Sequence, residues 1–96
     1  MTDKAVPTVQ VDNDRVRVTE WRFAIGAATG YHRHEFDYVV VPRTTGQLKI
    51  VDAKGNVSFA DLSAGQSYYR DAGVEHDVIN AHDDEFVFVE IELKQT

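Results

Sequence analysis

Residues 16–42 read VRVTEWRFAIGAATGYHRHEFDYVVVP, and this stretch sets the first expectation for the fold. Apolar and polar residues alternate through residues 16–25, which is typical of a β-strand with one buried face. The apolar parity flips near Thr19, so we expect either a bulge there or a strand that bends between two sheets. Glycines then bound a turn at residues 26–30, and a second apolar run follows at residues 38–41. The stretch therefore predicts two strands joined by a loop.

The rest of the chain repeats this arrangement of short apolar runs and frequent turns. Turn signals recur roughly every 8–12 residues, and the runs between them are rich in Val, Ile, Phe, Tyr and Thr. No segment sustains the i, i+3, i+4, i+7 apolar spacing of an amphipathic helix. The pattern predicts an all-β protein built as a sandwich or barrel.

Size and composition narrow the class of protein further. A chain of 96 residues predicts one domain over residues 1–96, with a core at about 14–93 and a flexible N-terminus at residues 1–6. The net charge of −6 disfavours binding to nucleic acid or to an anionic membrane. Because cysteine is absent, thiolate metal sites and disulfides are excluded. With no apolar run near the roughly 20 residues of a membrane span and no secretory signal pattern, we expect a cytoplasmic protein.

The run FVFVEIEL at residues 86–93 is apolar on both faces at its first half. One face carries Val87, Val89, Ile91 and Leu93, and the other carries Phe86 and Phe88 before Glu90 and Glu92. Two explanations stay open. Either a second subunit covers the surface near the two phenylalanines, or the strand is tucked under a loop. We expect a homodimer that is built on strand edges and on the surface near Phe86 and Phe88.

Half of the four histidines lie at positions 32 and 34, where a strand would point both to the same face. By itself this pair favours two solvated surface histidines. His76 changes the balance, because Val74 and Val78 flank it on one strand face and so place it inward. An inward imidazole needs a partner, which a metal shared with the pair would supply, as would a hydrogen bond to Asn80, a tyrosine or water. His82 lies in a polar turn and is expected to be solvated.

Two spaced motifs resemble those of the cupin superfamily. Residues 26–46 place a glycine, two histidines and a later glycine as in G-x5-H-x-H-x(3,4)-E-x6-G, but the glutamate is missing. Residues 65–80 resemble G-x5-P-x-G-x2-H-x3-N, with Asp71 where the family has proline. Together with EFVFVEIE at residues 85–92, these stretches look like the small single-domain cupins described as β-alanine degradation proteins.

The resemblance implies a small jelly-roll β-barrel of antiparallel strands with a divalent transition metal at its mouth. Carried over by position, the ligands would be His32, His34 and His76, and the ion could be Zn, Fe, Mn, Ni or Cu. Asp37 would take the place of the missing glutamate if the strand register shifts, and Tyr38 is an alternative. Glu35 follows a histidine directly, so strand alternation would point it away.

The expected substrate pocket draws on polar side chains close to these histidines, namely Tyr38, Tyr69, Arg70 and Asn80. We therefore expect a protein that acts on or binds a small carbonyl or carboxylate metabolite, in a pathway such as β-alanine catabolism. The alternative is a non-enzymatic binding or sensor cupin with weak metal binding or none. Whether the protein is an enzyme stays open at this point.

Overall fold

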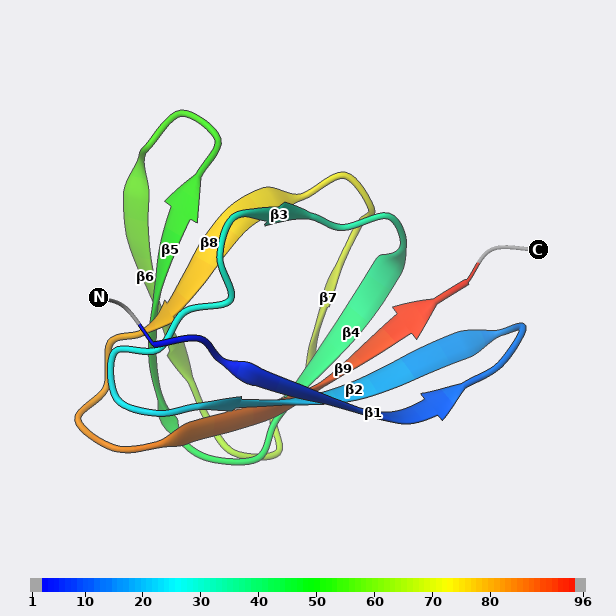
Figure 1. The fold of residues 1–96 in the computed structure, drawn as a ribbon, viewed down its shortest axis with the longest axis horizontal. Coiled ribbons are helices and arrows are strands. Elements are labelled where there is room, and N and C mark those ends of the chain that lie inside the picture. Colours follow the sequence, from blue (N-terminus) through cyan, green and yellow to red (C-terminus); the bar gives the residue numbers. More distant parts are fainter. Residues whose placement is uncertain (1–2, 95–96) are drawn as a thin grey trace.

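The computed structural model describes residues 3–94, and this part of the chain forms strands and loops without a helix (Figure 1). The strands are β1 (Val6–Asp12), β2 (Val16–Phe23), β3 (His32–Arg33), β4 (Asp37–Pro42), β5 (Gly46–Asp52), β6 (Val57–Leu62), β7 (Tyr68–Arg70), β8 (Glu75–Asn80) and β9 (Phe86–Leu93). The prediction of an all-β protein is confirmed. No helix in residues 3–94 could serve as a membrane span, and Met1 and Thr2 lie outside the described residues.

The strands form two antiparallel sheets that face each other (Figure 1). One sheet has the order β1-β2-β9-β4-β7 and the other has the order β3-β8-β5-β6. Because neighbours in each sheet come from distant parts of the sequence, the chain crosses repeatedly between the layers, as it does in a jelly roll. The predicted jelly-roll class is confirmed, in the form of two hydrogen-bonded layers packed on one interior.

Aromatic rings fill the interior between the two sheets. Phe23 is fully buried and contacts Phe88 with a centroid distance of 5.4 Å and Phe86 with one of 6.4 Å. Leu48 from the second sheet is 1% exposed and closes the core from the other side. Gly46 lies against this cluster, because a Cβ there would stand 2.7 Å from the ring of Phe86. The second glycine of the first motif is thus needed for close packing.

The alternation of β9 places acidic residues inside the molecule. Phe86 and Phe88 are 0% and 6% exposed, and Glu90 and Glu92 follow them on the same inward face. The two phenylalanine side chains are therefore covered within the chain and do not need a second subunit to bury them. The physical reason is the position of β9 between β2 and β4, where its phenylalanine face meets Phe23 in the core.

Strand β2 pairs with β9 without interruption from Val16 to Phe23, so the bulge expected near Thr19 is absent from this ladder. Thr19 is 4% exposed and lies on the inward face, while valines 16 and 18 face outward. The irregularity lies instead in β1, where the register shifts between residues 9 and 11. At the N-terminal end, backbone hydrogen bonds of 2.9 Å tie residues 3–5 to Ala28, so these residues have a defined place.

Candidate metal centre

The two sheet segments that carry the histidines are paired directly. His32 on β3 lies opposite His76 on β8 in an antiparallel ladder, so both side chains leave the sheet on the same side. His34 comes just after β3, and its backbone is held from both directions. Its N–H donates to the Val74 carbonyl, and its carbonyl accepts from Gly73, each at 2.9 Å. The glycine-bounded turns thus position a third imidazole beside the first two.

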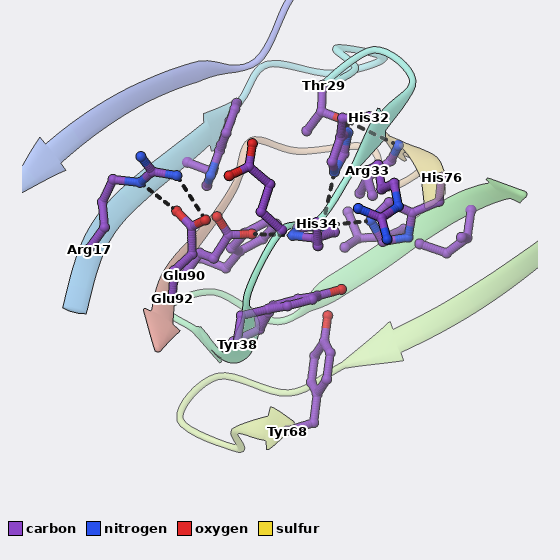
Figure 2. A pocket seen from close by; sticks show the side chains of 17 residues that line it. Arg17, Thr29, His32, Arg33, His34, Tyr38, Tyr68, His76, Glu90 and Glu92 are labelled. Atoms are coloured by element: carbon purple, nitrogen blue, oxygen red, sulfur yellow. Dashed lines mark hydrogen bonds and ion pairs between the residues drawn. The ribbon is translucent and has the colours of Figure 1, made fainter. Parts of the chain in front are cut away.

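The three imidazoles converge through their Nε2 atoms (Figure 2). The Nε2 of His34 lies 3.0 Å from that of His32 and 3.1 Å from that of His76. A metal that binds imidazole at about 2.0–2.1 Å holds neighbouring ligand nitrogens roughly 3–3.4 Å apart. The donor set and these two separations therefore fit one divalent transition metal ion, and all three ligand atoms lie within 4.8 Å of one another.

The tautomer of His32 is fixed by the loop that precedes it. Its Nδ1 lies 2.8 Å from the carbonyl oxygen of Gly30, and a carbonyl can only accept, so Nδ1 carries the proton. The Nε2 atom then presents its lone pair to the cluster. This is the arrangement in which a backbone carbonyl orients a metal-binding histidine.

The other two histidines are held in the neutral form that metal binding requires. Burial, and next the neighbouring His32, lower the pKa of His34 to about 4. The same two causes in the same order, with smaller contributions from His34 and Arg70, lower the pKa of His76 to about 4. At neutral pH both imidazoles therefore offer lone pairs.

A cavity of about 270 Å³ opens in front of the three imidazoles. It is lined by Arg17, Trp21, Thr29, His32, Arg33, His34, Glu35, Tyr38, Val40, Leu48, Ile50, Tyr68, His76, Val78, Phe88, Glu90 and Glu92. Its walls combine core aliphatic groups with a few polar ones, as small-molecule sites do. The ring of Tyr38 stacks on that of His34 at 3.9 Å and 16°, and burial raises the pKa of the Tyr38 hydroxyl above its usual range.

Two carboxyl groups from β9 enter this cavity, and they differ in their partners (Figure 2). Glu92 accepts a bidentate pair from Arg17, at 2.7 Å from Nε and 2.9 Å from Nη2. Glu90 is 8% exposed, and its Oε2 lies 3.8 Å from Nδ1 of His34. Burial, and next the charge of Glu92, raise the pKa of Glu90 to about 7. Because burial favours the neutral form of both Glu90 and His34, their contact is not a conventional ion pair.

The interior carboxyl groups were not predicted as site residues, although the sequence contained a signal for them. Glu90 and Glu92 continue the period-two face that begins with Phe86 and Phe88, so a core position for the phenylalanines implies an inward position for the acids. The indole N–H of Trp21 on the neighbouring strand is buried without a hydrogen-bond partner, although it lies close enough to lower the pKa of Glu90.

Of the expected pocket residues, the structure places Tyr38 in the cavity lining and the other three elsewhere. Tyr69 is 49% exposed, and the guanidinium of Arg70 lies 4.5 Å from the ring centroid of Tyr68. Asn80 is 2% exposed, and its amide donates to main-chain carbonyls of residues 23, 24 and 84. Asn80 thus fastens the loop before β9 to the end of β2.

The acids near the histidine pair are also placed differently from the sequence expectation. Asp37 is not among the cavity-lining residues, and its Oδ1 accepts a hydrogen bond of 2.7 Å from the backbone N–H of Ala72. Glu35, which strand alternation was expected to point away, lines the cavity because β3 ends before it. His82 lies outside the cavity beside Asp83, as the polar turn suggested.

Comparison with known proteins connects this geometry to a family. The β-alanine degradation protein BauB of Pseudomonas aeruginosa is 63% identical over 91 residues, which is 95% of each chain. A scan against models of known protein families found no match.

Solved structures resemble the whole fold. A cupin domain from Bordetella pertussis has a TM-score of 0.95 and 57% identity, covering 99% of this chain and 98% of that one. A protein with a double-stranded β-helix domain from Klebsiella pneumoniae has a TM-score of 0.78 at 20% identity, covering 95% and 77%, and so shares the fold alone. With a jelly roll, three converging histidines and relatives this similar over nearly its whole length, the chain belongs to the cupin superfamily, in the family of BauB.

Proposed function

We propose that this protein binds a divalent transition metal through His32, His34 and His76 and acts on a small carbonyl or carboxylate metabolite. The observation that carries the proposal is the convergence of three Nε2 atoms, with neighbouring separations of 3.0 and 3.1 Å, at the wall of a cavity. When bound, such an ion would keep positions open for water or substrate and would polarise a carbonyl oxygen. Zn, Fe, Mn, Ni and Cu all suit three imidazoles.

The residues of the chain supply the binding side of this chemistry. Val40, Leu48 and Val78 form an apolar floor that limits access of water, and a volume of about 270 Å³ suits a small ligand. Arg33, at the end of β3, offers a guanidinium at the same cavity, where it would pair with a substrate carboxylate. The hydroxyl groups of Tyr38 and Tyr68 point toward each other within the cavity and would orient an oxygen-rich substrate (Figure 2).

The name of the relative supports a place in the breakdown of β-alanine. BauB is described as a β-alanine degradation protein. We therefore propose substrates of the corresponding chemical class, which are three-carbon amino acids and the oxo acids that they become when the amino group is removed. A ligand of this class has a carboxylate for Arg33 and a carbonyl or amine for the histidine cluster.

Metal analysis tests this proposal first. Protein purified without an affinity tag should contain about one transition metal ion per chain, and His76→Ala should lose it. The metal-loaded protein should then turn over malonate semialdehyde or a related small oxo acid. Substoichiometric metal that His76→Ala leaves unchanged would refute the metal site, and no turnover across the panel would refute the enzymatic role.

A second candidate is a binding or sensor cupin with weak metal or none. It is favoured by the position of Asp37, whose carboxylate holds the Ala72 N–H and is not part of the histidine cluster. Without a carboxylate ligand, the site would bind metal through three neutral imidazoles alone. Calorimetric binding of a small acid by chelator-treated protein, with no turnover, would favour this candidate over the first.

We also propose that the protein forms a homodimer through a strand edge, which is one of the two surfaces that the sequence suggested. Strand β1 is exposed along its whole length and is an outer strand of its sheet. An antiparallel edge can pair with a second copy of itself across a two-fold axis. Light scattering at micromolar concentration should give twice the monomer mass, and a monomer mass would refute the dimer.

A further inference from the structure

The two histidines of the first motif are oriented from behind by different groups. Nδ1 of His32 donates to a backbone carbonyl at 2.8 Å, which leaves its Nε2 free for the cluster. Nδ1 of His34 points away from the cluster, toward the interior end of the cavity. There the oxygen Oε2 of Glu90 lies 3.8 Å from it, and both side chains are at most 10% exposed (Figure 2).

The neighbouring acid, Glu92, is held by a different partner. Both carboxylate oxygens of Glu92 accept from Arg17, at 2.7 and 2.9 Å. Of the two carboxyl groups that β9 places in the cavity, Glu90 is the one that lies beside His34. Since β9 is paired on both sides, with β2 and with β4, the backbone that carries Glu90 is fixed relative to the site.

We propose that Glu90 is a positioning residue that holds His34 with its proton on Nδ1 and its Nε2 lone pair toward the metal. It would do for His34 what the Gly30 carbonyl does for His32. The separation of 3.8 Å is longer than a hydrogen bond, so the proposal includes a small rotation of the glutamate side chain that closes the contact when metal binds Nε2. This inference rests on the proposed metal site. In it Glu90 contacts Nδ1 of the ligand His34 and does not bind the metal itself.

A proton on Nδ1 of His34 also explains why the Nε2 atoms of His32 and His34 would attract a cation. With both histidines protonated on Nδ1, the Nε2 lone pairs of His32 and His34 face each other at 3.0 Å. Two lone pairs at that distance repel unless a proton or a metal ion lies between them. A carboxylate behind one ring thus raises the affinity of the cluster for a cation in front of it.

Zinc affinity, measured by chelator competition at about pH 7.5, tests the proposal with three variants. Glu90→Gln keeps the shape but removes the charge, and Glu90→Asp keeps the charge but shortens the reach. Glu85→Gln removes an equal charge from an exposed residue outside the cavity and is the matched control. We expect both Glu90 variants to weaken zinc binding by about 10- to 100-fold. The control should change it by less than about threefold, because exposed charges are screened.

Two outcomes would overturn the proposal. If Glu90→Gln binds zinc as tightly as the control, Glu90 has no role at the site. If Glu90→Asp binds zinc as tightly as the unmodified protein, a negative charge at this position is sufficient and the contact with Nδ1 of His34 is not needed. Thermal melts of the metal-free variants establish that each is folded.

The Nδ1 proton of His34 gives a second readout. In the metal-free protein, we expect the Nε2 of His34 to carry the proton, because it lies 3.0 Å from the unprotonated Nε2 of His32. Zinc at Nε2 would leave the proton on Nδ1, and its hydrogen bond to Glu90 should move the Nδ1–H resonance downfield relative to zinc-loaded Glu90→Gln. The same resonance position in both zinc-loaded proteins would refute the positioning role. If the protein binds no zinc at all, the proposed function fails; if Glu90→Gln binds zinc as the parent does, only the positioning role fails.

Discussion

Glu90→Gln is expected to stabilise the metal-free protein at alkaline pH. Burial raises the pKa of Glu90 from 4.5 to about 7, with the charge of Glu92 as the next cause. The folded state thus holds this proton more tightly than the unfolded chain. The stability that results is fully present below about pH 4.5 and is lost as the pH rises through 7. The difference between 4.5 and about 7 corresponds to about 3 kcal/mol, and glutamine removes this loss because it does not titrate.

Urea denaturation of both proteins in the presence of a chelator measures the effect. The difference in the free energy of unfolding between variant and parent is measured at pH 5 and again at pH 8. Any effect of the glutamine amide that does not depend on pH is the same at both values and cancels. From pH 5 to pH 8, the difference should move in favour of glutamine by about 2–3 kcal/mol. A difference that stays constant with pH, or that moves in favour of glutamate, would refute the assignment of Glu90 as a buried, largely unpaired carboxyl group.

Three further predictions concern packing, pH and the missing ligand. Gly46→Ala should destabilise the protein by about 1–3 kcal/mol in urea denaturation, because its Cβ would lie 2.7 Å from the ring of Phe86. The metal-free protein should lose stability as the pH falls from about 6.5 to about 4, because His34 and His76 keep folded pKa values of about 4. Circular dichroism with acid titration measures this, and unchanged stability across that range would contradict the burial of the two imidazoles. Asp37→Asn should keep zinc affinity within about threefold in chelator competition, since its carboxylate holds a backbone N–H outside the cluster. A loss of tenfold or more would make Asp37 a ligand after all.

The fold could be predicted from the sequence because its signals are local. Alternating apolar residues and turns bounded by glycine, aspartate and asparagine are properties of a few neighbouring residues, and they predicted strands close to the observed ones. The inward position of His76 was predictable in the same way, from the valines two residues before and after it. The motif spacing then predicted that His32 and His34 lie close to His76, more than forty positions later in the sequence.

The rest of the site depends on which face of each strand meets the core, and local pattern does not decide this. The face with Val89 and Ile91 is continuously apolar, but the structure buries the other face, because Phe88 packs on Phe23 across the ladder. Glu90 follows on that buried face. Asp37 was expected near the metal because it is close to the histidines in sequence. Its carboxylate instead accepts a hydrogen bond from the backbone N–H of Ala72, which the sequence pattern does not reveal.

The position of the acid bears on why a cupin can lack the glutamate of its first motif. A glutamate from that motif would approach the metal directly, whereas Glu90 on β9 lies 3.8 Å from Nδ1 of His34, the ring nitrogen that faces away from the cluster. Keeping a carboxyl group buried there costs about 3 kcal/mol at alkaline pH, as the raised pKa implies. Metal binding can offset this cost, because an ion at Nε2 makes the Nδ1 proton a better partner for the carboxylate. The same substitution should therefore stabilise the empty protein and weaken its hold on metal, and a residue with a purely structural role would not produce these opposite effects.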